Sequence, residues 1–331
     1  MDVRHLATVV AAAIVMTSGT GGCSKPTEAP AKRAAGSATA AGSATADPAL
    51  VERGRYLATV AGCGTCHTNA MDPKAKPFAG GLEQEEHVGI WRSSNITPDV
   101  ATGIGGWTDA QIIAAIREGK RPDGRLLKPI MPYPMYNAMT DDDARALVAF
   151  LRTVAPVTNQ VAPSELTLPD MPVPPPANRP VDATPLARGA YLTTLMHCDA
   201  CHTPMDLTAM RPDLSRRLAG GMPMELPRMG DGVLHPSNIT SDVATGIGSW
   251  TTAQVLDAVL RLKRPDGSTL TGPMMFYVSA WNQLTPDDQT ALATFIKSVP
   301  AVSNQVPRST FVMRPLPGPP PSNVGSAAPT P

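Results

Sequence analysis

The sequence Cys-Gly-Thr-Cys-His at residues 63–67 decides how this chain is interpreted, and Cys-Asp-Ala-Cys-His repeats the pattern at 198–202. Two thiols three positions apart can form thioethers with the two vinyl groups on one edge of a porphyrin, and the histidine that follows can coordinate the iron. The sequence therefore predicts two covalently bound c-type haems. The predicted attachment residues are Cys63, Cys66, Cys198 and Cys201, and the predicted proximal ligands are His67 and His202.

Zinc binding or thiol–disulfide chemistry is the alternative interpretation of a Cys-x-x-Cys pair. The chain has five cysteines, of which four lie in the two motifs and the fifth, Cys23, lies far upstream. No further thiol is therefore close to either motif to complete an all-cysteine zinc site, and a histidine would have to follow both pairs by coincidence. Haem attachment is favoured over both alternatives.

A long repeat surrounds the two motifs and indicates a tandem duplication. The sequence Asn-Ile-Thr-Pro-Asp-Val-Ala-Thr-Gly-Ile-Gly-Gly-Trp-Thr at 95–108 returns almost unchanged at 238–251, which is 143 residues later. Arg-Pro-Asp-Gly at 121–124 returns at 264–267 with the same offset, whereas the cysteine motifs are 135 residues apart. The second copy has therefore gained eight residues between its cysteine motif and its Asn-Ile-Thr loop.

One methionine in each copy is predicted to be the second axial ligand of the haem iron. The 143-residue offset aligns Met131 with Met274, and both lie on proline-containing loops before the last helix of their copy. Proline stiffens such a loop and helps to hold a weak thioether ligand in place. Ligation by His and Met raises the reduction potential, which suits an electron carrier. Because the chain contains 16 methionines, Met135 and Met275 remain alternatives.

Helices are expected at three places in each copy. The helix before the cysteine motif is expected over 48–61 in the first copy and 185–196 in the second. A Thr-x-x-Gln capping box, which predicts a helix start, occurs at Thr108 and at Thr251. The last helices are expected to begin near Thr140 and Thr285, where aspartates favour the positive end of the helix dipole.

The N-terminus is typical of an export signal. Residues 1–22 contain a short basic start, an apolar stretch too short to span a bilayer, and small residues before Cys23, as in a bacterial lipoprotein signal. Lipidation is favoured over an ordinary secretory signal, because an unpaired thiol in an oxidising compartment is a liability. We therefore expect a periplasmic protein that a lipid on Cys23 attaches to a bacterial membrane.

Composition divides the rest of the chain. Residues 23–46 are rich in small polar residues and are expected to form a flexible tether. Prolines concentrate in 158–183, which is expected to be a semi-rigid extended linker, and in the tail 308–331. Two haem-binding domains are predicted between these segments, at 47–157 and 184–307.

The chain resembles the dihaem cytochromes c that are built from two class I cytochrome c domains. The resemblance covers about 47–160 and 184–307. It rests on the Cys-x-x-Cys-His motifs, the Asn-Ile-Thr loops and Met-Pro-Tyr at 131–133, which look like the cytochrome c subunits of bacterial membrane-bound alcohol, sorbitol and gluconate dehydrogenases. It implies an all-α fold in which a few helices wrap each haem, with the attachment residues and ligands named above. Met-Met-Phe at 274–276 departs from the Met-Pro-Tyr pattern.

Electron transfer without substrate chemistry is the function that these features favour. The expected partners are redox proteins: a dehydrogenase as donor and a cytochrome or an oxidase as acceptor. A formal net charge of zero gives no support for nucleic-acid binding.

A dihaem enzyme, such as one like the cytochrome c peroxidases, is the alternative function. His87 and His235 precede the Asn-Ile-Thr loops. Surface or loop positions are favoured for both, and the alternative is that they are haem ligands or contact the haem propionates. A peroxidase would be favoured if His235 replaced Met274 as a ligand. A dihaem thiosulfate dehydrogenase would need a cysteine ligand, and none is left after lipidation of Cys23. The duplicated ligand spacing disfavours a purely structural lipoprotein without haem.

Overall fold

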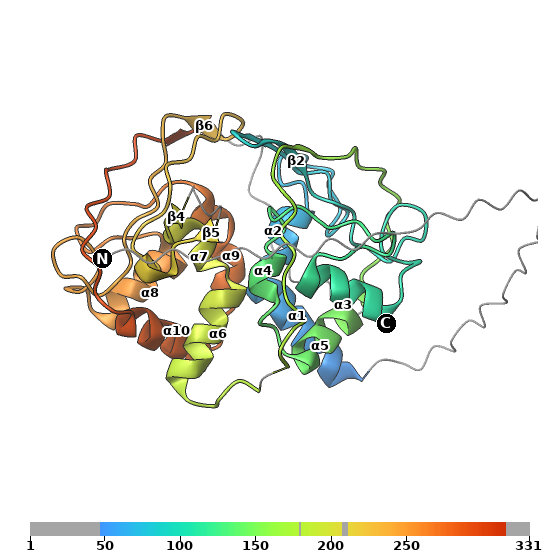
Figure 1. Cartoon of the computed structure of the whole chain (residues 1–331), viewed down its shortest axis with the longest axis horizontal. Helices are drawn as coiled ribbons and strands as arrows, with labels where there is room; N and C mark the ends of the chain where they lie inside the picture. The colour runs from blue at the N-terminus through green and yellow to red at the C-terminus, as the bar shows by residue number, and fades with distance from the viewer. Residues whose placement is uncertain (1–46, 179, 207–210, 316–331) are drawn as a thin grey trace, which may run out of the picture. The chain divides into compact units, whose positions relative to one another are not determined.

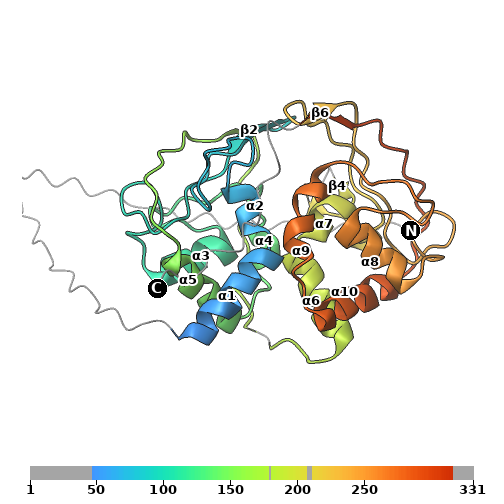
Figure 2. The same cartoon turned by 180° about the vertical axis from the view of Figure 1, so that it is seen from behind.

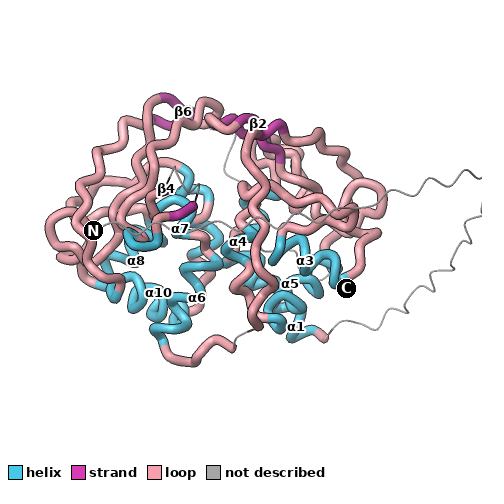
Figure 3. The backbone as a smooth tube through the Cα atoms, in the orientation of Figure 1, coloured by secondary structure: helices cyan, strands magenta, loops and turns pink. Residues whose placement is uncertain are grey.

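The computed structural model describes residues 47–178, 180–206 and 211–315, which belong to one compact unit of the chain. The expected export signal 1–22, Cys23, the rest of the tether up to residue 46 and the tail from residue 316 lie outside the described residues. Helices and long irregular loops make up most of what is described, and strands are confined to short stretches (Figure 3). Within these residues, no helix combines the length and the apolar composition that crossing a membrane requires.

Helices follow one another in the same order in both copies of the repeat (Figure 1). In the first copy they are α1 (Pro48–Val60), α2 (Cys63–His67), α3 (Asp109–Glu118), α4 (Tyr133–Tyr136) and α5 (Asp141–Thr153). In the second copy they are α6 (Pro185–Leu195), α7 (Cys198–His202), α8 (Thr252–Arg261), α9 (Val278–Trp281) and α10 (Pro286–Ser298). Two 3-10 turns, η1 (Leu214–Arg216) and η2 (Pro273–Phe276), also lie in the second copy.

Threonine caps begin the helices where the sequence predicts. The Thr108 hydroxyl accepts a hydrogen bond from the Gln111 backbone amide (3.3 Å), and Gln111 Oε1 accepts one from the Thr108 amide (2.8 Å). Thr251 begins α8 with the same capping box. Thr140 caps α5 and Thr285 caps α10. These predicted helix starts are confirmed.

The first and last helices of each copy pack closely because a glycine lies where they meet (Figure 2). A Cβ atom at Gly54 of α1 would lie 1.9 Å from the carbonyl oxygen of Ala146 in α5. One at Gly189 of α6 would lie 2.0 Å from the carbonyl oxygen of Ala291 in α10. Any larger residue would push the two helices apart, so these glycines set how closely each pair can approach.

Short strands occur where the all-α prediction has none. The antiparallel sheet of the first copy consists of β1 (Glu83–Glu86), β2 (Gly89–Arg92) and β3 (Glu165–Leu166). In the second copy β4 (Met205–Asp206) pairs with β5 (Arg211–Pro212), and β6 (Gly230–Asp231) pairs with β7 (Val312–Met313). The fold is therefore rich in helix with small sheets. Through β7, the described start of the Pro-rich tail is paired with the second copy.

The Pro-rich segment 158–183 lies against the first copy. It contributes β3, which pairs with β2. The Tyr133 hydroxyl donates a hydrogen bond to the carbonyl oxygen of Met171 (2.7 Å), and the Asn137 side chain donates one to that of Pro174 (2.9 Å). The segment thus takes part in the packing of α4 as well as connecting the copies.

Two tyrosines exchange hydrogen bonds between the copies. Tyr191, from the second copy, donates to Asp143 of the first (2.7 Å), and Tyr56, from the first copy, donates to Asp288 of the second. Each carboxylate also accepts a hydrogen bond from an arginine of its own copy. Arg53 donates to Asp143 (2.9 Å), and Arg188 donates to Asp288 (2.7 Å). The helices follow the same reciprocal pattern, since α1 packs on α9 and α6 packs on α4.

One apolar core extends through both copies. Leu57 and Met139 of the first copy belong to the same buried cluster as Leu192 and Trp281 of the second. Both copies therefore share the environment in which the cysteine motifs lie.

Candidate haem site

All eight predicted site residues line one cavity of about 1360 Å³. They come from α2, from α7 and from the loops that carry the two methionines, and they are Cys63, Cys66, His67, Met131, Cys198, Cys201, His202 and Met274. Most of the cavity wall is apolar, with a few polar groups. A large apolar cavity with few polar groups is typical of a cofactor site.

The two motif helices begin in the same unusual way. The residue before the first cysteine has a left-handed backbone in both copies, with φ 65° at Gly62 and φ 46° at His197. Within each helix the two cysteines are three positions apart and therefore lie on one face. Each motif thus presents both thiols to the same side, as attachment to one edge of a porphyrin requires.

The four thiols of the motifs are protonated at neutral pH. Burial raises the pKa of Cys63 and of Cys198 to about 12 and that of Cys201 to about 11, and it also raises the pKa of Cys66. These thiols are therefore uncharged. Among the described residues, no three His, Cys, Asp or Glu side chains are grouped so that they could hold a metal ion.

The imidazoles of the two motifs are held alike. His67 Nδ1 lies 2.7 Å from the carbonyl oxygen of Ser94, and His202 Nδ1 lies 2.8 Å from that of Ser237. Burial lowers the pKa of both rings, so they are neutral at neutral pH and Nδ1 donates its proton to the carbonyl. That leaves the lone pair on Nε2, which is the arrangement that metal-ligating histidines usually have.

The repeated Asn-Ile-Thr loops hold the carbonyl groups in place. Asn95 Oδ1 accepts hydrogen bonds from the amide (3.0 Å) and the hydroxyl (2.7 Å) of Thr97, and Asn95 Nδ2 donates to the carbonyl oxygen of Val157 (2.7 Å). Asn238 makes the matching hydrogen bonds in the second copy. The serines whose carbonyls hold the histidines directly precede these asparagines, so each loop orients the imidazole of its copy.

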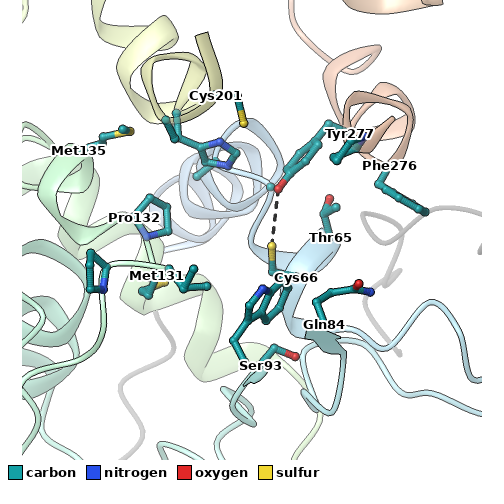
Figure 4. A pocket seen from close by; sticks show the side chains of 18 of the residues that line it. Thr65, Cys66, Gln84, Ser93, Met131, Pro132, Met135, Cys201, Phe276 and Tyr277 are labelled. Atoms are coloured by element: carbon teal, nitrogen blue, oxygen red, sulfur yellow. Dashed lines mark hydrogen bonds between the residues drawn. The ribbon is translucent and has the colours of Figure 1, made fainter. Parts of the chain in front are cut away.

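The two predicted methionine ligands lie in the cavity wall, Met131 just before α4 and Met274 in η2. Met135 also lines the cavity and remains an alternative to Met131 (Figure 4). Met275 is 37% exposed and is not part of the wall. The geometry therefore favours Met274 over Met275.

The two alternative histidines differ in position. His87 is exposed in the turn between β1 and β2, outside the cavity wall. His235 lines the cavity together with Ser237. Of the two, His235 is therefore the histidine that remains a possible ligand.

Comparison with known proteins agrees with this geometry. A family model described as "Cytochrome c" matches residues 51–155. A protein of Cereibacter sphaeroides named "Diheme cytochrome c-type" is 30% identical over 272 residues, which cover 76% of this chain and 86% of that protein. The chain belongs to the cytochrome c family.

Longer cytochrome c proteins are also similar to the chain. The cytochrome c subunit of an alcohol dehydrogenase (quinone) from Gluconacetobacter polyoxogenes is 36% identical over 280 residues, or 78% of this chain and 57% of that protein. The cytochrome c subunit of a gluconate 2-dehydrogenase from Pantoea cypripedii is 36% identical over 275 residues, or 77% and 61%. The chain thus spans somewhat more than half the length of these two relatives.

The cavity wall includes an arginine with a free hydrogen-bond donor that suits the haem of a cytochrome c. Arg121 Nε is buried and has no hydrogen-bond partner, and the Asp123 carboxylate is 3.6 Å away, beyond hydrogen-bond distance. Arg264, at the equivalent place in the second copy, also lines the cavity. A buried guanidinium N–H without a partner calls for an anionic group, and haem has two propionates. The residues present therefore fit the cofactor.

Several residues of this cytochrome c cavity were not predicted from the sequence. Ser94 and Ser237 were missed although the repeat extends to them, one residue upstream of each asparagine. Gln84, which is 2% exposed with an unpaired Oε1, comes from β1, and its sequence has no counterpart in the second copy. Tyr277 was missed because proline stands 143 residues before it, at position 134. The repeat could have indicated the two serines, but it could not have indicated Gln84 or Tyr277.

Proposed function

We propose that the chain is an electron carrier that binds two haems c, one through Cys63, Cys66 and His67 and the other through Cys198, Cys201 and His202. The observation that carries the proposal is the twofold occurrence of one arrangement. In each copy two cysteines on a helix face, a neutral histidine held by a serine carbonyl and a methionine border the same apolar cavity. Bound haem supplies one-electron chemistry between ferrous and ferric iron.

The residues that would coordinate the two irons in this proposal are His67 with Met131 and His202 with Met274. In each pair the chain holds the imidazole through its Nδ1 proton and offers the methionine from a loop that proline stiffens. A methionine ligand would raise the reduction potential, and it would leave no open position on the iron for peroxide. These residues bind and tune the cofactor, and the chain contributes no substrate chemistry in this proposal.

The domain organisation that we propose is two tandem class I cytochrome c domains, 47–157 and 184–307, joined by the Pro-rich segment 158–183. The recurrence of the helix order and of the Asn-Ile-Thr loop hydrogen bonds supports it.

A dehydrogenase is the proposed electron donor, because relatives are named as cytochrome c subunits of alcohol, gluconate and fructose dehydrogenases. A cytochrome or an oxidase is the proposed acceptor. To identify the donor, candidate dehydrogenases are purified and mixed with the chain and with their own substrate. Fast, saturable reduction of the chain that depends on this substrate identifies the partner.

The proposed location is the periplasm, with a lipid anchor on Cys23. Membrane fractionation of cells that produce wild-type protein or Cys23→Ser tests it. Release of the variant into the soluble periplasm supports the anchor, and membrane retention of the variant contradicts it.

The first test of the function is the haem content of the matured protein. We expect two haems per chain that remain attached after denaturation, and one haem after Cys63→Ala/Cys66→Ala or after Cys198→Ala/Cys201→Ala. In an optical redox titration, two six-coordinate haems with a methionine–iron charge-transfer band, inert to carbon monoxide and peroxide, support the carrier. Protein without covalent haem contradicts the proposal.

A dihaem peroxidase is the second candidate, and the position of His235 in the cavity wall favours it. A high-spin or bis-histidine haem that reacts with peroxide would support it. His235→Ala should then remove the reaction, whereas the carrier is expected to keep its spectrum in this variant.

A further inference from the structure

The ring of Tyr277 contacts the same position in both copies of the repeat. That position, directly before the first motif cysteine, is Gly62 in the first copy and His197 in the second. A Cβ atom at Gly62 would lie 2.5 Å from the Tyr277 ring, so the ring fills the space that a side chain would need. His197 packs against the ring, with centroids 5.2 Å apart and an interplanar angle of 74°. Tyr277 therefore lies at the start of both motif helices.

The hydroxyl of Tyr277 extends this contact to an attachment residue. It lies 3.6 Å from Cys66 Sγ, and Figure 4 shows Tyr277 between Cys66 and Cys201. Cys201 and Tyr277 both line the cavity. Once Cys66 is a thioether its sulfur has no proton, so only the tyrosine can donate in this contact. One side chain thus connects the sulfur of one motif with the other motif.

Neighbouring groups hold the ring in this position. Tyr277 stacks on Trp281, with centroids 5.0 Å apart and planes 20° from parallel. Trp281 is 5% exposed, and its Nε1 donates a hydrogen bond to the carbonyl oxygen of Val60 in α1 (3.3 Å). Aromatic stacking and this hydrogen bond fix the ring between the copies.

We propose that Tyr277 is the bridge for electron exchange between the two haems, an inference that rests on the function proposed above. The exchange transfers one electron, so that one iron is oxidised as the other is reduced. No bond forms or breaks, no proton moves, and Tyr277 is neither oxidised nor reduced. Electron tunnelling decays more slowly through bonded and packed atoms than across empty space. The Tyr277 ring is packed against the residue directly before each motif, and its hydroxyl reaches Cys66.

Tyr56 provides the matched control. Its hydroxyl also connects the two copies, because it donates a hydrogen bond to Asp288. Unlike Tyr277, however, Tyr56 lies in α1 and is not part of the cavity wall. Tyr56→Phe therefore loosens the contact between the copies without touching either cysteine motif. Tyr277→Phe removes the hydroxyl and keeps the ring, whereas Tyr277→Leu removes the ring.

The test uses matured, full-length protein that is half reduced. Two-dimensional exchange NMR of the haem methyl resonances measures the electron exchange, and dilution separates the intramolecular rate from the intermolecular one. We expect Tyr277→Leu to slow intramolecular exchange by an order of magnitude, Tyr277→Phe to slow it less, and Tyr56→Phe to leave it unchanged. Tyr277→Phe should also lower the potential of the haem at 63–67 alone, because its sulfur loses a hydrogen-bond donor.

Two results would overturn the bridge. One is exchange in Tyr277→Leu within a factor of two of wild type, at full haem content and unchanged potentials. The other is equal slowing in Tyr56→Phe, which would assign the effect to a loosened contact between the copies. If the Tyr277→Leu variant does not incorporate haem, Tyr277→Phe provides the test. An unchanged potential of the haem at 63–67 in Tyr277→Phe would contradict the proposed contact between the Tyr277 hydroxyl and the sulfur of Cys66. A failure of the proposed electron-carrier function can be told apart from a failure of the bridge, because in that case the wild-type protein would contain no covalent haem.

Discussion

The hydroxyl of Tyr56 donates a hydrogen bond to the carboxylate of Asp288, which lies 232 positions later in the chain. Arg188 donates two more hydrogen bonds to this carboxylate, each 2.7 Å long, and Asp288 is 6% exposed. Tyr191 and Arg53 surround Asp143 in the same way. Each buried carboxylate therefore stabilises its own copy and the contact with the other copy.

Asp288→Asn should lower the free energy of unfolding by about 3 kcal/mol, because it leaves a largely buried Arg188 without its counter-charge. Urea unfolding at neutral pH, followed by circular dichroism, measures the change. Asp287→Asn is the matched control, since Asp287 is the exposed neighbour in the same helix turn and should change little. Equal effects of both substitutions would show that the loss comes from the helix dipole and not from the ion pair.

The contribution of Asp288 should disappear in acid. Burial alone would raise its pKa, but the hydrogen bonds from Arg188 and Tyr56 outweigh burial and the pKa of Asp288 lies below its ordinary value. A folded-state pKa below the unfolded one gives stability that is complete above about pH 4 and lost as the pH falls through the folded-state pKa. The difference in unfolding free energy between wild type and Asp288→Asn should therefore shrink in this range. A difference that persists undiminished in strong acid contradicts the pKa direction.

Gly54→Ala should destabilise the chain by about 3 kcal/mol or prevent its maturation, because the new methyl group would meet the Ala146 carbonyl oxygen at 1.9 Å. Thermal unfolding and the yield of haem-containing protein measure the effect. Gly106→Ala is the control, since its Cβ would find no atom closer than 3.8 Å. A tolerated Gly54→Ala would mean that α1 and α5 can separate at little cost.

Met131→Leu should remove about half of the methionine–iron charge-transfer band and lower the potential of one haem, because the proposed thioether ligand, which favours ferrous iron, would be lost. Redox titration with optical detection measures both effects. Met275→Leu should change neither, since Met275 lies outside the cavity wall. If Met135→Leu and not Met131→Leu removes the band, the ligand of the first copy is Met135.

Local and repeated signals made much of this fold predictable. The capping boxes at Thr108 and Thr251 form within one helix turn, so their sequence suffices to place the helix starts. Candidate site residues of each motif could be proposed because spacing within a short helix determines which side chains share a face. The paired methionines could be proposed because duplication allowed one copy to be aligned with the other.

Features that depend on distant partners could not be predicted in the same way. The strand pair of β2 and β3 joins Ile90 to Glu165, and two-residue strands leave no periodic pattern to detect. The Pro-rich segment was expected to be extended, but its hydrogen bonds to Tyr133 and Asn137 depend on how α4 packs. Tyr277 acquires its position only when the two copies meet, which neither copy encodes by itself.

The reciprocal tyrosines have the pattern of an isologous interface, in which each half offers the same surface to the other. In a homodimer with such an interface, the association weakens as the subunits become more dilute. Here both halves belong to one chain, so their encounter is intramolecular and proceeds at an effective concentration that the segment between them sets. The spacing of the two cysteine motifs therefore does not depend on how many copies of the protein a cell makes.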